Sequence, residues 1–339
     1  MLYSAVFGVV SAMVGAGFAS GREIIRFFSQ YGHWSWGLAM LAAAVMGGMM
    51  YALMNSGPGM DALIPSGKLH ILGKTLFLLL LTATGGAMTA AAGELAALTV
   101  PLLHARSMGS LLTLCACVAC SRKTIVFLGW VGKALVPLLL TAFFLCFRLP
   151  SGEAPQFPMT LPKLLLALLQ LLGYCGLNVT LSAGVILEAG KGKTASEKRK
   201  IVLLTSAVLG FLLLGGNAAL LPHGAKLQDA SLPMVMLLKD YGKTGFYLSA
   251  VLLYLAVFST LVAVLRGMRD MLGNRGVWAG LMCGAASLLG FSEIVGSAYP
   301  MLGWLGLLLL FGKLFFKAGT NCFPRSSNGR KPNEEEGNQ

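Results

Sequence analysis

Long apolar runs constrain the fold of this chain more than any other feature of its sequence. A helix of about 20 apolar residues crosses the ~30 Å hydrocarbon core of a bilayer. Runs of this kind, two of them shorter, cover residues 2–28, 34–54, 75–100, 107–121, 124–147, 162–188, 200–221, 245–268, 276–291 and 294–316. They are continuous and rich in Leu, Ala and Gly, without the period-2 alternation of a membrane β-barrel. The sequence therefore predicts an all-α integral membrane protein with ten transmembrane helices.

The charge distribution predicts how this protein is oriented. Charged residues make up 12% of the chain, against roughly 25% in soluble domains, and the net charge is +13. Most Lys and Arg residues fall in alternate connections and in the tail, at 61–74, 122–123, 191–200, 266–275 and 313–331. Cytoplasmic loops carry such an excess, so both termini are expected in the cytoplasm. The basicity reports orientation, and we do not expect nucleic-acid binding.

The first apolar run contains a group of glycines that should break its helix. Gly15, Gly17 and Gly21 lie close together in its middle, and glycine is a poor helix former. Inside a bilayer the freed backbone groups must meet protein, water or a ligand. Discontinuous helices of this kind form the binding sites of many transporters, so the break is a candidate site.

A secretory signal peptide is an alternative interpretation of this segment, because Gly17-Phe18-Ala19 resembles a small-x-small cleavage site. No basic residue precedes the apolar run, however, and apolar residues resume at Ile24. We therefore expect the segment to remain in the mature protein.

A second interruption lies near the middle of the sixth run, at Gly173-Tyr174-Cys175-Gly176-Leu177-Asn178. Interruptions at corresponding positions of two halves indicate a transporter site. The halves, 1–149 and 150–317, hold five runs each, so the second half should be inverted relative to the first. Residues 318–339 are polar and are expected to form a disordered cytoplasmic tail.

Several polar residues in or beside the runs are functional candidates. Lys133 should lie some 15 Å deep, counted at about 1.5 Å per residue from the end of its helix, and it is either functional or part of a structural pair. Arg22 and Glu23, just beyond the first break, could form an external gate, a mutual ion pair or a solvated pair. Ser259 and Thr260 could serve a site or bond to their own helix. A short helix over 233–240 is a candidate cap.

Other chemistries lack the necessary residues. Cys115, Cys117 and Cys120 should point to different faces of one helix, so they are interpreted as packing residues and not as a metal site. Paired carboxylates, a histidine cluster and an activated nucleophile are all missing from the apolar runs. We therefore do not expect an enzyme.

The segment from Gly15 to Ile24, followed by Phe27-Phe28 and Tyr31-Gly32, resembles the opening signature of the YkvI-like family of bacterial membrane proteins. The resemblance extends to the ten-span layout and, more loosely, to Tyr174 and Asn178; Leu177 stands where a second aromatic residue is expected. The family resembles the amino acid-polyamine-organocation superfamily. This implies the leucine-transporter (LeuT) fold, a 5+5 inverted repeat with discontinuous helices one and six, in the bacterial cytoplasmic membrane.

The resemblance also implies site residues. The substrate would lie between the broken helices, against Gly15, Ala16, Gly17, Phe18, Ser20, Tyr174, Gly176 and Asn178. A sodium ion would be held by the carbonyl groups of Ser11, Val14 and Ala256 and the hydroxyl groups of Ser259 and Thr260. In some proton-coupled relatives a lysine ammonium takes that place, which makes Lys133 the proton-coupling candidate. The two cations would repel each other, so one of them should be present at a time.

The sequence therefore predicts a secondary transporter of a small organic solute, an amino acid or a related amine, driven by a proton or sodium gradient. Its partners would be the solute, the coupling ion and the lipid bilayer, and the only cofactor in view is the sodium ion. The amides and the dipole of the half-helix after the break would face an anionic group of the solute. A non-transporting membrane receptor or sensor with the same fold is the alternative.

Overall fold

The computed structural model describes residues 2–57, 59–60, 64, 69–100, 102–150, 154, 157–227, 230, 232–275, 277–288 and 303–308. Helix accounts for 88% of them, and none lies in a strand. The prediction of an all-α fold is confirmed over these residues.

Six helical segments among the described residues are long and apolar enough to cross a membrane. They are η1 (Ser29–Trp34) with α4 (Ser35–Met54), α5 (Leu69–Thr99), α7 (Thr124–Phe147), α8 (Leu161–Leu181), α10 (Ala195–Leu220) with η3 (Leu221–His223), and α12 (Pro233–Leu238) with η4 (Lys239–Tyr241) and α13 (Gly242–Leu272). Three shorter apolar helices are α1 (Leu2–Met13), α6 (Ala105–Cys120) and α14 (Val277–Ser287). These elements make the chain a multi-pass membrane protein.

The remaining short elements connect the long ones. They are α2 (Ala16–Ala19), α3 (Arg22–Phe27), α9 (Ala183–Gly190), α11 (Gly224–Leu227) and η5 (Gly273–Arg275). The tenth predicted run, 294–316, is described only at 303–308, which is helical, and the predicted tail 318–339 lies outside the described residues. The ten-helix repeat therefore remains a prediction.

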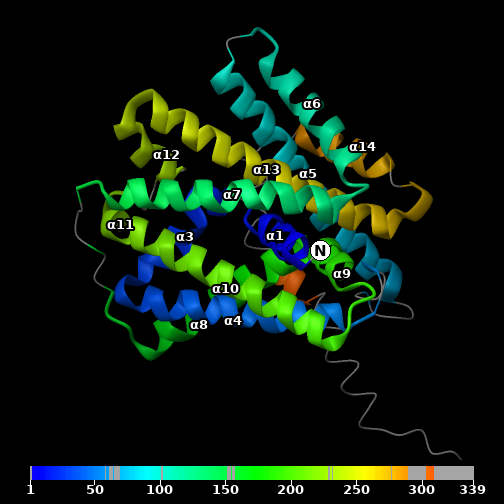
Figure 1. The fold of residues 1–339 in the computed structure, drawn as a ribbon, viewed down its shortest axis with the longest axis horizontal. Helices are drawn as coiled ribbons and strands as arrows, with labels where there is room; N and C mark the ends of the chain where they lie inside the picture. Colours follow the sequence, from blue (N-terminus) through cyan, green and yellow to red (C-terminus); the bar gives the residue numbers. More distant parts are fainter. Residues whose placement is uncertain are drawn as a thin grey trace, which may run out of the picture.

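Helix α1 lies in the centre of the molecule, between α7 and α10 (Figure 1). Glycines allow α1 and α7 to approach each other very closely. A Cβ atom added to Gly132 would lie 2.9 Å from the carbonyl carbon of Phe7, and one added to Gly129 would lie 2.9 Å from the carbonyl oxygen of Ser4. Small residues at helix interfaces allow this kind of packing inside membranes. The central helix is therefore held against α7 by backbone contacts.

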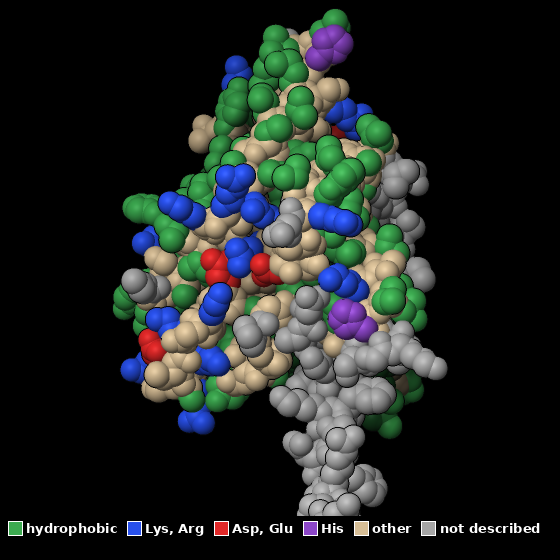
Figure 2. Space-filling model, turned by 90° about the vertical axis from the view of Figure 1, so that its right-hand side faces the viewer, with side chains coloured by type: hydrophobic (Ala, Val, Ile, Leu, Met, Phe, Trp, Pro, Cys, Tyr) green, Lys and Arg blue, Asp and Glu red, His purple; other side chains and the backbone are tan. Residues whose placement is uncertain are grey.

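The end of the molecule that carries α9 is rich in basic side chains (Figure 2). There α9 packs tightly on α13, since a Cβ atom on Gly184 would lie 2.9 Å from Cα of Gly267. Arg266 joins the two helices: its Nε lies 3.2 Å from Glu188 Oε2 and its Nη2 lies 3.2 Å from Asp270 Oδ1. This is the end that the charge distribution assigns to the cytoplasm.

Candidate functional site

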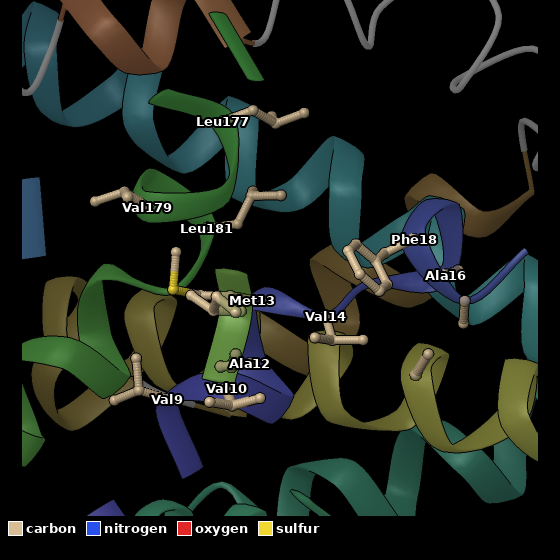
Figure 3. Close-up of a cluster of buried hydrophobic side chains, with 14 of the residues drawn as sticks. Val9, Val10, Ala12, Met13, Val14, Ala16, Phe18, Leu177, Val179 and Leu181 are labelled. Atoms are coloured by element: carbon tan, nitrogen blue, oxygen red, sulfur yellow. The ribbon is translucent and has the colours of Figure 1, made fainter. Parts of the chain in front are cut away.

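The predicted break in the first apolar run is confirmed. Helix α1 ends at Met13, Gly15 is extended (φ −82°, ψ 179°), and α2 begins at Ala16. A second turn follows at Gly21, whose φ of +81° is in the left-handed region that favours glycine, and α3 begins at Arg22. Figure 3 shows the extended chain between Val14 and Ala16, with Val14 directed toward α13. The single predicted span is thus three helical pieces.

The break leaves backbone groups without hydrogen-bond partners. The amide of Gly15 donates to the carbonyl oxygen of Met13 at 3.1 Å, so it does not continue the helical pattern to Ser11. In the described part of the chain, no bond is made by the amides of Ala16, Gly17 and Phe18 or by the carbonyl groups of Ser11, Ala12 and Val14. The unpaired carbonyl groups therefore lie before the extended residue Gly15, and the unpaired amides lie after it.

Protein covers this break on nearly every side. Residues 11–16 and 18–21 are buried, and Gly17 alone among residues 11–21 is partly exposed. Helices α8 and α13 contact α1, and α13 also contacts α2. The unpaired groups do not face the lipid, as a bilayer requires, and Gly17 marks the point at which the break is accessible.

Helix α13 places the hydroxyl group of Thr260 beside the break. A Cβ atom on Gly15 would lie 3.3 Å from Thr260 Oγ1, which is buried and has no hydrogen-bond partner. Ser259 Oγ instead donates to the carbonyl oxygen of Ala256 at 3.0 Å, the alternative that its position in a helix suggested. Ser11 Oγ donates to the carbonyl oxygen of Leu128 at 2.9 Å. Among the predicted sodium ligands, Thr260 therefore supplies a hydroxyl oxygen that lies beside the break and has no hydrogen-bond partner.

An uncharged oxygen of this kind suits a sodium ion. Hard cations prefer hydroxyl and carbonyl oxygens. A hydroxyl oxygen buried without a partner is also costly, and a bound cation would satisfy it. The unpaired carbonyl groups of Ser11 and Val14 belong to the same break. The residues present therefore fit the predicted ion, although the described residues contain no group of three or more His, Cys, Asp or Glu side chains that could hold a metal.

The predicted interruption at 173–178 is wrong in position. Helix α8 continues through these residues to Leu181, and the change of helix falls at Ser182 (φ −92°, ψ 1°), just before α9. The glycines serve helix packing instead, because a Cβ atom on Gly176 would lie 3.1 Å from Leu307 Cδ1 and 3.2 Å from the carbonyl oxygen of Gly303. Gly176 therefore faces residues 303–308.

Sequence reasoning missed the polar residues around the actual change of helix. Thr180 and Ser182 are fully buried, and the hydroxyl oxygen of each has no hydrogen-bond partner. Two hydroxyl residues spaced by one position in an apolar run were the available signal.

Tyr174 connects α8 to the segment that follows the first break. Its ring centroid lies 5.1 Å from that of Phe27 and 5.3 Å from that of Phe28. Asn178 is buried, and its Nδ2 donates to the carbonyl oxygen of Tyr174 at 3.0 Å. The structure thus brings Tyr174 beside α3, whereas the amide of Asn178 is engaged on its own helix.

Phe18 of α2 and Ser20, the residue that follows this helix, contact neighbouring elements. Phe18 is 1% exposed, and its ring centroid lies 6.4 Å from that of Phe143 on α7. Ser20 Oγ donates to the carbonyl oxygen of Gly17 at 3.0 Å. The carbonyl oxygen of Ser20 accepts from the amide of Met234 at 2.8 Å, so the short helix predicted over 233–240, observed as α12 and η4, is joined to the α2–α3 turn.

Arg22 and Glu23 do not form the mutual ion pair that was considered. Arg22 is exposed and lines a cleft of about 430 Å³ together with Arg26, Gln30 and Phe157. Glu23 is buried, and its carboxyl group lies against Gly17, where a Cβ atom would be 2.7 Å from Glu23 Cδ. Adjacent positions on a helix point in different directions, which separates the two charges.

The structure does not bring Lys133 to the break. Its side chain is exposed, and its Nζ lies 5.0 Å from the ring centroid of Trp130 in a cation–π contact. The adjacent Gly132 faces α1, so Lys133 points away from that interface. Although Lys133 lies well inside α7 along the sequence, its side chain does not reach the break between α1 and α2 in this conformation.

The chain was also compared with known proteins. No protein-family model and no curated protein matched it. Its resemblance to the YkvI-like family therefore rests on the residues quoted above.

Proposed function

We propose that this protein is a secondary transporter that moves a small organic solute, an amino acid or a related amine, by alternating access. The solute would bind at the break between α1 and α2 and be driven by a proton or sodium gradient. The proposal includes the LeuT-type inverted repeat and a location in the bacterial cytoplasmic membrane, with both termini in the cytoplasm.

The observation that carries this proposal is the buried break at Gly15. Unpaired amide and carbonyl groups within a membrane-spanning segment are costly, and they persist where a ligand can satisfy them. Here they lie beside the orphaned hydroxyl of Thr260 and the partly exposed Gly17. A purely structural break would leave these groups unsatisfied without compensation.

The cleft lined by Arg22 and Arg26 supports a solute with an anionic group. Both side chains are exposed, and the nearby Glu23 is buried away from them. A concave surface lined by one sign of charge raises the local concentration of the opposite charge. A carboxylate, as in an amino acid, fits the charge of this cleft.

Uptake into proteoliposomes tests the proposal. Purified protein would be reconstituted, and labelled amino acids and polyamines would be offered under an inward sodium gradient or an inward proton gradient, imposed separately. We expect accumulation of at least one compound under one gradient, and none in protein-free vesicles. Specific binding without uptake would instead favour the receptor alternative, and neither binding nor uptake would contradict both functions.

A matched pair of glycine variants locates the site. Gly17→Val would place a branched side chain at the accessible point of the break and should abolish uptake. Gly48→Val is the control, because a Cβ atom there has no neighbour within 4 Å. Equal loss in both variants would indicate a general defect in folding and not a site at the break.

A further inference from the structure

Glu23 has a buried carboxyl group beside the break. The residue is 6% exposed, and its Oε2 is fully buried without a hydrogen-bond partner. The carboxyl group lies over Gly17, the accessible residue of the break. Glu23 belongs to the apolar run 2–28, and an ionisable residue within such a run is by default a functional hypothesis.

The elements that pack most closely on α3 supply no described ion-pair partner to the Glu23 carboxyl group. Helix α3 packs against α2, η1, α8 and α10. Helix α2 has no ionisable residue. On α8, the Nζ of Lys163 lies 4.7 Å from the ring centroid of Phe157, and Tyr174 packs on Phe27 and Phe28.

The other ionisable groups on these elements are also directed elsewhere. In η1, His33 is exposed, and Tyr31 donates its hydroxyl to Gln170 Oε1 at 2.6 Å. The ionisable residues of α10 are all in its first turns, at 197–200, far along the helix from Gly216, which faces Ile24 of α3. On α3 itself, Arg22 and Arg26 are exposed and line the cleft. Within the described residues, none of the ion pairs includes Glu23.

We propose that Glu23 binds the proton that is transported together with the solute. The inference rests on the proposed transport function and selects the proton as the coupling ion. A proton from water on one side would add to one carboxylate oxygen, giving a neutral carboxylic acid, and the same proton would later leave to water on the other side. On uptake an O–H bond of a hydronium ion breaks as the carboxyl O–H bond forms, and on release the carboxyl O–H bond breaks as a water molecule accepts the proton.

This placement couples the proton to an anionic solute by simple electrostatics. A solute carboxylate at the break would lie near Gly17 and hence near the Glu23 carboxyl group. Two negative charges repel strongly in a medium of low dielectric constant, so the solute binds better when Glu23 is neutral. By linkage, a bound solute also strengthens proton binding, and the two are carried together.

Infrared difference spectroscopy tests the protonation without any solute. Spectra of purified wild-type protein and of the isosteric variant Glu23→Gln would be compared in H₂O and D₂O at neutral pH. We expect a protonated-carboxyl stretching band that shifts in D₂O, is missing in Glu23→Gln and persists in Glu94→Gln, a control whose carboxylate is paired with Arg106 near the surface. A band unchanged by Glu23→Gln, or no such band in the wild type, would overturn the proposal.

Transport measurements test the coupling separately. One unit of pH gradient can sustain about tenfold accumulation of a solute carried with one proton. Glu23→Gln should lose this accumulation and retain exchange of labelled for unlabelled amino acid, which moves no net proton. Glu23→Asp, which keeps an acid, should retain part of the accumulation. Full pH-driven accumulation in Glu23→Gln would overturn the proposal for Glu23. If the wild type moves no solute, the transport function is contradicted, and the infrared spectra alone decide whether Glu23 binds a proton.

Discussion

The carboxyl group of Glu23 occupies the space that a side chain on Gly17 would need. The glycine therefore does more than interrupt a helix, because it makes room for an acid beside the accessible point of the break.

Gly17→Ala should displace the Glu23 carboxyl group at a small cost in stability. The obstructing atoms are the far end of a flexible side chain, and holding a side chain about 30° away from a staggered rotamer costs about 0.5–1.5 kcal/mol. Thermal unfolding of the purified protein would measure this loss. The double variant Gly17→Ala/Glu23→Ala removes the collision, so the two substitutions should not be additive. Additive losses would show that the two residues do not touch.

Gly132→Ala should destabilise the protein more than Gly17→Ala. The added methyl group would meet the backbone of Phe7 on α1, which cannot rotate away as a side chain can. Overpacking of this kind costs about 1–3 kcal/mol. Gly37→Ala, at a helix position with no neighbour within 4 Å, is the matched control and should be neutral or slightly stabilising. Similar unfolding midpoints for the two variants would contradict the close approach of α1 and α7.

Asn217→Ala should loosen the contact between η1 and α10. Asn217 Oδ1 accepts from Ser29 Oγ at 2.9 Å, and its Nδ2 donates to Ser35 Oγ at 2.8 Å, with all three residues fully buried. Leaving buried polar groups unpaired costs about 1–3 kcal/mol. Asn55→Ala, on an exposed helix end, provides the comparison for thermal unfolding. Because the two residues share a hydrogen bond, the double variant Ser29→Ala/Asn217→Ala should be only slightly less stable than Asn217→Ala alone.

Thr260→Val tests the sodium alternative. If sodium binds beside Gly15, sodium chloride should stabilise the wild type relative to choline chloride, by about 2.7 kcal/mol at a concentration one hundred times the dissociation constant. The isosteric valine removes the unpaired oxygen and should abolish this gain. Thr84→Val is the control, because Thr84 is buried and its hydroxyl is engaged with the carbonyl oxygen of Leu80. An equal sodium effect in Thr260→Val would exclude that hydroxyl as a ligand.

Lys133→Gln should leave proton-driven uptake intact. The ammonium group lies over Trp130 on the exposed face of α7 and does not approach the break. Loss of uptake in this variant, with a normal unfolding midpoint, would show that Lys133 takes part in transport.

Much of the helical layout could be predicted from hydropathy, because a bilayer leaves few options for an apolar run. The break at Gly15 was predictable for a similar reason: several glycines in the middle of one span conflict with a continuous helix. The short helix over 233–240 was also recognisable from its position between longer runs.

The details that depend on neighbouring helices were not predictable. Glycine in a membrane helix can break it or let another helix approach, and at Gly176 the structure shows the second use. For Lys133, the sequence indicates depth along a helix but not the direction in which the side chain points. For Glu23, adjacency to Arg22 suggested a pair, and the α3 geometry places the two on different sides.

The backbone contact between α1 and α7 has a mechanical consequence. Helices held together through glycines and carbonyl groups cannot slide past each other without separating, so α1 and α7 should move as one rigid body. The α2–α3 piece is bonded to α12, through the bond between Ser20 and Met234, and it also contacts α7 through the rings of Phe18 and Phe143. The extended link at Gly15 is the point at which α2 and α3 can change their angle to α1, and a stiffer residue there would be expected to restrict that motion.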